Sequence, residues 1–84
     1  MNKTRPRLYT LTTCLHCKAT KNFLKKHGIE FDYVDVDTLT GTEREEVISE
    51  IMELTGTRRF PTIIIGERVI IGFREDELRE ALDL

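Results

Sequence analysis

The sequence has no tryptophan and no long apolar run, and it has only two cysteines and two prolines among its 84 residues. Its longest uncharged apolar stretch, residues 63–66, is far too short to span a bilayer. The N-terminus also lacks the apolar core of a secretory signal. These absences predict a soluble protein of the cytoplasm that has no membrane partner.

Neither sign of charge dominates the sequence. Thirteen Lys and Arg residues against fifteen Asp and Glu residues give a net charge of −2, which argues against a nucleic-acid partner. The composition is 39% hydrophobic with no low-complexity tract, as is typical of a globular protein. Because a chain of this length builds one hydrophobic core, we expect a single domain over residues 1–84.

Hydrophobic periodicity predicts seven elements in the order β-α-β-α-β-β-α. The predicted strands are 7–13, 31–37, 62–65 and 68–71, and the predicted helices are 15–27, 42–55 and 75–82. Thr42 and Glu45 have the spacing of a capping box, and Leu15 opens the apolar stripe of the first helix. The helix between the first two strands predicts that they are parallel, and the two-residue link Gly66-Glu67 predicts a hairpin.

The only two cysteines, Cys14 and Cys17, stand where the first strand passes into the first helix. Cys14 in the first turn faces unpaired backbone N–H groups and the positive end of the helix dipole, which stabilise a thiolate. Cys17 lies one turn deeper and is less accessible, so it suits the resolving role. We therefore predict Cys14 as the nucleophile and Cys17 as the resolving thiol. His16 stays open, either as a cation that stabilises the thiolate or as an ordinary exposed helix residue.

Two structural roles for the cysteine pair are weaker interpretations. A disulfide that closes a four-residue loop contributes little chain-entropy stabilisation, and the cytoplasm would keep it reduced. A closed zinc site wants four ligands, and this chain offers one Cys pair with His16 and His27 as its only imidazoles. We therefore expect no metal held within one chain, although ligation across a dimer stays open.

Cys14-x-x-Cys17 after the first strand and Pro61 before the third make residues 7–82 resemble the glutaredoxins and glutaredoxin-like redoxins. Residues 54–66 are similar in spacing to the glutaredoxin segment that has a Thr-Val-Pro triplet ahead of its third strand. The resemblance implies a thioredoxin-like α/β fold, with a four-stranded mixed sheet flanked by three helices. It also implies a thiol-disulfide oxidoreductase that serves electron transport and cell redox homeostasis by reducing protein or glutathione-mixed disulfides.

The resemblance also assigns roles at the site. Pro61 is expected to be cis and to pack beside the dithiol, and the backbone of Phe60 is expected to pair with the incoming thiol peptide as an added strand. Arg58 would hold a carboxylate of glutathione, and the turn at Gly72 would hold its other end. His16 and Phe73 complete the predicted substrate-binding set. No bound cofactor is expected, and glutathione enters as a co-substrate.

The electron donor stays open at this point. Gly72-Phe73-Arg74 is similar to the Gly-Phe-Arg of redoxins that thioredoxin reductase reduces, so glutathione and thioredoxin reductase are both candidates. The expected partners are proteins that carry a disulfide, and we expect a monomer. The alternative function is a metal or iron-sulfur carrier in which Cys14 of two chains ligates a cluster. Leu15, in place of the family's usual proline, motivates that alternative.

Overall fold

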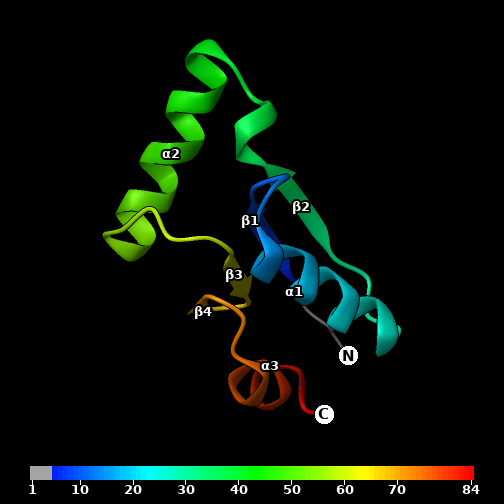
Figure 1. Ribbon diagram of the computed structural model, residues 1–84. Coiled ribbons are helices and arrows are strands. Elements are labelled where there is room, and N and C mark those ends of the chain that lie inside the picture. The colour runs from blue at the N-terminus through cyan, green and yellow to red at the C-terminus, as the bar shows by residue number, and fades with distance from the viewer. Residues whose placement is uncertain (1–4) are drawn as a thin grey trace.

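The computed structural model describes residues 5–84, so residues 1–4 of the predicted domain lie outside the described range. The elements are β1 (Arg7–Thr10), α1 (Leu15–Lys26), β2 (Asp32–Asp35), the 3-10 turn η1 (Val36–Thr38), α2 (Gly41–Thr55), β3 (Thr62–Ile65), β4 (Arg68–Ile71) and α3 (Glu75–Leu82) (Figure 1). The predicted order β-α-β-α-β-β-α is confirmed, with η1 as an addition.

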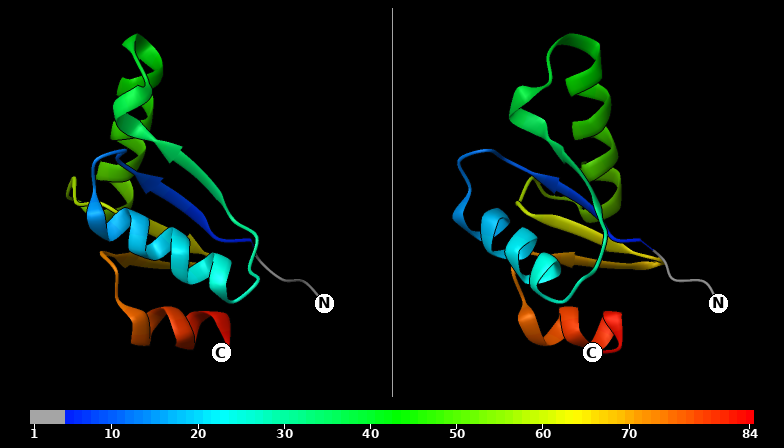
Figure 2. Two further views of the ribbon diagram at one scale, coloured as in Figure 1. Left: turned by 45° about the vertical axis from the view of Figure 1, so that its right-hand side comes forward. Right: turned by 90° about the vertical axis from the view of Figure 1, so that its right-hand side faces the viewer.

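The four strands form one mixed sheet in the order β2-β1-β3-β4. β1 pairs in parallel with β2 and antiparallel with β3, and β3 and β4 form the predicted antiparallel hairpin. The helices α1 and α3 cover one face of this sheet, and α2 covers the other (Figure 2). The predicted thioredoxin-like architecture is therefore present.

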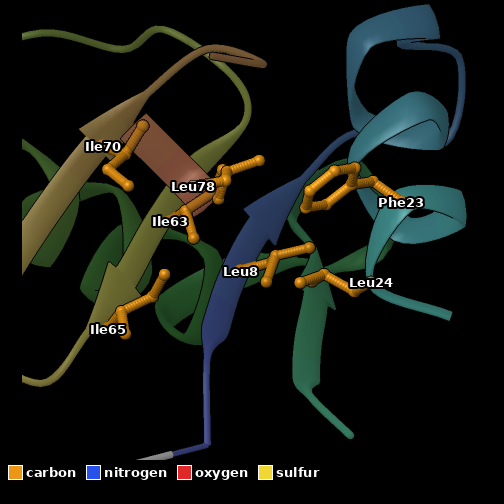
Figure 3. Close-up of a cluster of buried hydrophobic side chains, with 7 residues drawn as sticks. All are labelled: Leu8, Phe23, Leu24, Ile63, Ile65, Ile70 and Leu78. Carbon is orange, nitrogen blue, oxygen red and sulfur yellow. The ribbon is translucent and has the colours of Figure 1, made fainter. Parts of the chain in front are cut away.

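Each face of the sheet carries its own apolar cluster. On the face of α1 and α3, seven buried side chains pack together: Leu8, Phe23, Leu24, Ile63, Ile65, Ile70 and Leu78 (Figure 3). On the face of α2, the buried members are Tyr9, Val36 and Ile51. Because α1 contributes two side chains to the larger cluster, the helix that carries the cysteines is anchored on the more heavily packed face.

Several element boundaries differ from the prediction. β1 ends at Thr10, three residues early, because the backbone then turns toward the start of α1. β2 ends at Asp35 and tightens into η1. α2 begins at Gly41 with Thr40 as its N-cap, and the Thr40 side chain makes no capping hydrogen bond. The capping box predicted from Thr42 is therefore wrong.

Leu15 and Tyr33, two large apolar side chains of the predicted elements, face solvent. Leu15 was placed on the apolar stripe of α1, but its side chain is 77% exposed. Tyr33 is 52% exposed because β2 is an edge strand, and alternation along an edge strand does not guarantee burial. Within residues 5–84, none of the helices combines the length and the hydropathy needed to cross a bilayer.

Candidate active site

Cys14 occupies the N-cap position of α1, directly after the turn that follows β1. Its backbone N–H donates to the Leu11 carbonyl at 3.3 Å, and its own carbonyl accepts from Lys18 N–H at 3.2 Å. The Cys17 backbone N–H donates to Cys14 Sγ at 3.2 Å, as an N-cap side chain requires. A sulfur that accepts from a helix N-terminus is placed where negative charge is stabilised.

Cys17 lies about one helical turn after Cys14 and is fully buried. Both cysteines are free thiols, and Cys14 is half-buried. Burial, followed by the hydrogen bond with the Cys14 thiol, raises the pKa of Cys17 to about 12. The two sulfurs therefore belong to one hydrogen-bonded unit, with one accessible at the helix end and the other withdrawn into the protein.

The loop between β1 and Cys14 is tied to the end of the neighbouring strand. The Thr12 N–H donates to the two Asp37 carboxylate oxygens at 3.1 and 3.2 Å, and the Thr12 hydroxyl donates to Oδ2. The hydrogen bond from the Thr12 side chain lowers the pKa of Asp37 below its usual value. Asp37 lies in η1, and it reaches this loop because the parallel strands β1 and β2 end side by side.

The loop before β3 forms the second side of the site. The Phe60–Pro61 peptide bond is cis, as expected from the resemblance. The Cys14 thiol donates to the Phe60 carbonyl at 3.9 Å. The Gly72 N–H donates to the Pro61 carbonyl at 2.8 Å, which joins the turn before α3 to the same place. Figure 2 shows the start of α1, the loop before β3 and the turn before α3 at one end of the sheet.

The predicted site residues therefore fall into two groups. Cys17 and Phe60 contact Cys14 directly, and Pro61 and Gly72 are linked to it through Phe60. The remaining three, His16, Arg58 and Phe73, are not brought to the sulfur by any hydrogen bond between residues 5 and 84.

These three residues differ from one another in exposure. His16 and Arg58 are exposed. Phe73 is half-buried and packs edge-on against Phe23, with ring centroids 6.0 Å apart, so its ring is part of the α1–α3 packing. A direct part in substrate binding for these three residues stays a prediction.

Sequence reasoning missed two polar groups near the cysteines. One is the Thr12–Asp37 contact, and the other is an ion pair between Lys21 on α1 and Asp35 on β2, with Nζ and Oδ1 3.3 Å apart. Neither Asp35 nor Asp37 was predicted as a site residue. The useful signal was the predicted parallel pairing, since it brings the C-terminal end of β2 next to the loop that follows β1.

The described part of the chain, residues 5–84, contains no group of three or more His, Cys, Asp or Glu side chains arranged to hold a metal ion. The two sulfurs form a dithiol. A pair of thiols donates two electrons when it closes to a disulfide, and the disulfide accepts two electrons when it is reopened.

Comparisons with known proteins agree with this geometry. The model of the Glutaredoxin family matches residues 7–70. The glutaredoxin-like protein NrdH of Lactococcus lactis is 32% identical over 71 residues, which cover 84% of this chain and 90% of that protein. Methanoredoxin of Methanosarcina acetivorans superposes with a TM-score of 0.90 at 37% identity, covering 98% of this chain and 87% of that one.

A third similar protein is described by its activity. The NrdH-redoxin of Escherichia coli superposes with a TM-score of 0.74 at 30% identity, covering 90% of this chain and 92% of that one. That redoxin is described as a glutaredoxin-like protein with a thioredoxin-like activity profile.

Proposed function

Because this chain belongs to the glutaredoxin family, whose members are thiol-disulfide oxidoreductases, we propose that it reduces protein disulfides by attack of Cys14 and resolution by Cys17. The single observation that carries this proposal is the contrast between the two sulfurs. Cys14 caps the helix and is partly accessible, whereas Cys17, one turn on, is fully buried. A substrate disulfide reaches the first sulfur, and only an internal reaction reaches the second.

The proposed reaction has two exchanges. The Cys14 thiolate attacks one sulfur of the substrate disulfide, and the other substrate sulfur leaves as a thiolate that takes a proton from solvent. Cys17 then loses its proton and attacks Cys14 Sγ, which breaks the mixed disulfide and forms the Cys14–Cys17 disulfide. The substrate gains two electrons and two protons, and the dithiol loses them.

The loop that contains Phe60 supports a mode of substrate binding. Its carbonyl lies beside Cys14 Sγ, so an extended peptide bonded to that sulfur would run along this backbone as an added strand. We propose that Arg58 and His16, both exposed, contact the substrate from the loop and the helix. Glutathione, as a co-substrate, would place a carboxylate at Arg58 and its other end at Gly72 and Phe73.

Paired single substitutions test the roles of the two cysteines. Cys14→Ser is expected to abolish reduction of insulin disulfides, by at least a factor of about 10³, since no other exposed thiol remains. Cys17→Ser is expected to retain the first exchange and to accumulate a mixed disulfide with the substrate, visible by mass spectrometry. Full activity of the Cys14 variant, or a mixed disulfide on Cys17, would contradict the assignment.

The electron donor is tested separately. We propose a thioredoxin-reductase type of donor, supported by the likeness to NrdH proteins and by Gly72-Phe73-Arg74. The oxidised protein is offered either glutathione with its reductase or thioredoxin reductase, each with NADPH, and NADPH consumption is followed. Faster turnover with thioredoxin reductase is expected. Faster turnover with glutathione would assign glutathione as the donor instead and would leave the proposed dithiol chemistry unchanged.

A reducing compartment such as the cytoplasm suits this reaction, and we propose that a monomer carries it out. Size-exclusion chromatography with light scattering checks the oligomeric state. The alternative of an iron-sulfur carrier predicts a coloured dimer after anaerobic reconstitution, with iron bound at Cys14. A colourless, iron-free protein that still reduces disulfides would reject that alternative.

A further inference from the structure

Near Cys17, between α1 and β2, lies an ion pair that the reaction described above does not use. Lys21 Nζ is 3.3 Å from Asp35 Oδ1, and each side chain is only 20% exposed. In each of the other ion pairs between residues 5 and 84, both partners are at least 40% exposed. Since desolvation offsets much of the attraction in a mostly buried pair, stability alone is a weak reason for this arrangement.

Both partners of the pair are held in place by the sheet. The buried Thr10 hydroxyl on β1 donates to Asp35 Oδ1 at 2.5 Å. The Lys21 ammonium also lies 3.9 Å from the centroid of the Tyr33 ring, so a carboxylate and an aromatic face, both on β2, hold it. The positive charge is therefore kept against the sheet instead of moving freely in solvent.

The position of this charge along α1 is important. Lys21 follows Cys17 by four residues, so the two side chains are neighbours on one helix face, with Cβ atoms about 5–6 Å apart. Burial and the Cys14 thiol both raise the pKa of Cys17, whereas Lys21 lowers it, as does the Leu11 backbone. Within residues 5–84, Lys21 is the charged side chain that favours the Cys17 thiolate.

We propose that Lys21 is a positioning residue for the resolving step, in which its ammonium, held by Asp35, stabilises the negative charge that forms on Cys17. The inference rests on the proposed dithiol reaction. In this step Cys17 releases its proton to solvent and Sγ attacks Cys14 Sγ. The bond from Cys14 to the substrate sulfur breaks, and the substrate leaves as a thiolate that solvent protonates. Lys21 keeps its proton throughout.

Rapid mixing of the reduced protein with dipyridyl disulfide tests this role, because each exchange releases one coloured pyridinethione. The first phase reports the attack by Cys14, and the second reports the resolution by Cys17. The probe is neutral, so removing a lysine does not change its long-range attraction to the protein. Three variants are compared with the unmodified protein: Lys21→Met, Lys21→Arg, and the matched control Lys25→Met, which removes an exposed charge from the same helix.

For Lys21→Met we expect an unchanged first phase and a second phase about threefold slower at neutral pH, with its pH profile displaced to higher pH. Loss of the Lys21 charge lowers the thiolate fraction of Cys17, and the higher nucleophilicity of the more basic sulfur offsets part of that loss, so the expected net factor is only about three. Lys21→Arg should restore the second phase because it keeps the charge. Lys25→Met should leave both phases unchanged.

Three results would overturn the proposal: a second phase unaltered by Lys21→Met, equal slowing of both phases, or equal slowing by Lys25→Met. Equal slowing of both phases would indicate a general structural effect, which thermal unfolding of the variant would reveal independently. A failure of the proposed function looks different, since the unmodified protein itself would then release no pyridinethione from Cys14.

Discussion

One edge of α1 faces solvent and the other faces the sheet, and each edge carries one of the two thiols. On the outer edge Leu15 is 77% exposed and Cys14 is partly accessible, whereas Cys17 and Leu24 on the inner edge are fully buried. Three residues of a helix therefore separate a sulfur at the helix terminus from one in the interior. The comparison indicates that burial, more than spacing, separates the roles proposed for the two thiols.

The largest expected effect concerns the reactivity of the two edges. In the reduced native protein at pH 7, iodoacetamide should alkylate Cys14 at least about 10³ times faster than Cys17. With a pKa of about 12, the thiolate fraction of Cys17 is on the order of 10⁻⁵ at that pH, and its side chain has no exposed surface. Peptide mass mapping over time measures the ratio. In denaturant the two rates should be comparable. Comparable rates in the native protein as well would contradict the difference in accessibility between the two thiols.

The same edges should differ in stability. Leu24→Ala is expected to lower the free energy of unfolding by about 2–4 kcal/mol, because it removes a buried side chain from the α1–α3 cluster. Leu15→Ala is expected to change it by less than about 0.5 kcal/mol, since that side chain is already in solvent. Urea unfolding measures both values. Equal losses would show that the outer edge also supports the fold.

Alkaline pH should lower the free energy of unfolding through the buried thiol on the inner edge. The pKa of Cys17 is raised from 9.0 to about 12, so between these values the folded state retains a proton that the unfolded state has lost. The stability that the protonated Cys17 thiol contributes is therefore fully present below about pH 9 and is lost as the pH rises through about 12. The urea midpoint should therefore fall as the pH rises from about 9 to about 10.5.

Cys17→Ala provides the control for this pH dependence, because it removes the thiol while keeping an apolar side chain. Its urea midpoint should fall less steeply with pH. Some slope should remain, because burial, together with the hydrogen bond to Glu50, also raises the pKa of Tyr9 to about 12. Identical slopes in the two proteins would show that Cys17 does not contribute.

The smallest expected effect concerns the loop that leads to the outer edge. Asp37→Asn should slow the attack of Cys14 on dipyridyl disulfide about two- to threefold, because a neutral amide holds the Thr12 N–H and hydroxyl more weakly. Because the pKa of Asp37 is lowered below its usual value, its carboxylate is charged at neutral pH and this contact is intact there. The exposed Glu43→Gln is the control. An unchanged rate for Asp37→Asn would show that Thr12 is positioned without the carboxylate.

Much of this arrangement could be predicted from the sequence, because periodicity and turn residues act locally. Alternating and helical patterns predicted all seven elements in order, and Gly66-Glu67 predicted the hairpin. Strand ends were predicted poorly, since β1 stops where Thr12 turns toward Asp37, a partner 25 residues away. The exposure of Leu15 was likewise missed, because it depends on where the helix begins relative to the sheet.

The candidate site divides in the same way. Cys14 and Cys17 could be placed from the strand-to-helix junction alone, and the cis bond at Pro61 followed from the resemblance. The contacts of Asp37 and Lys21 could not, because both depend on which strand lies next to β1. Pairing between strands is a property of the folded chain, and composition and spacing constrain it only weakly.

The parallel pairing of β1 with β2 has one more consequence. It encloses both sulfurs, the loop that leads to them and the Lys21–Asp35 pair within one contiguous segment, residues 10–37. Phe60, Pro61 and Gly72 arrive from the later half of the chain and meet Cys14 through one carbonyl. Under the proposed function, the reactive groups lie in residues 10–37 and most of the proposed substrate contacts lie in the later half of the chain. We therefore expect a chimera that takes its later half from a related redoxin to act on new clients while keeping its own sulfur chemistry.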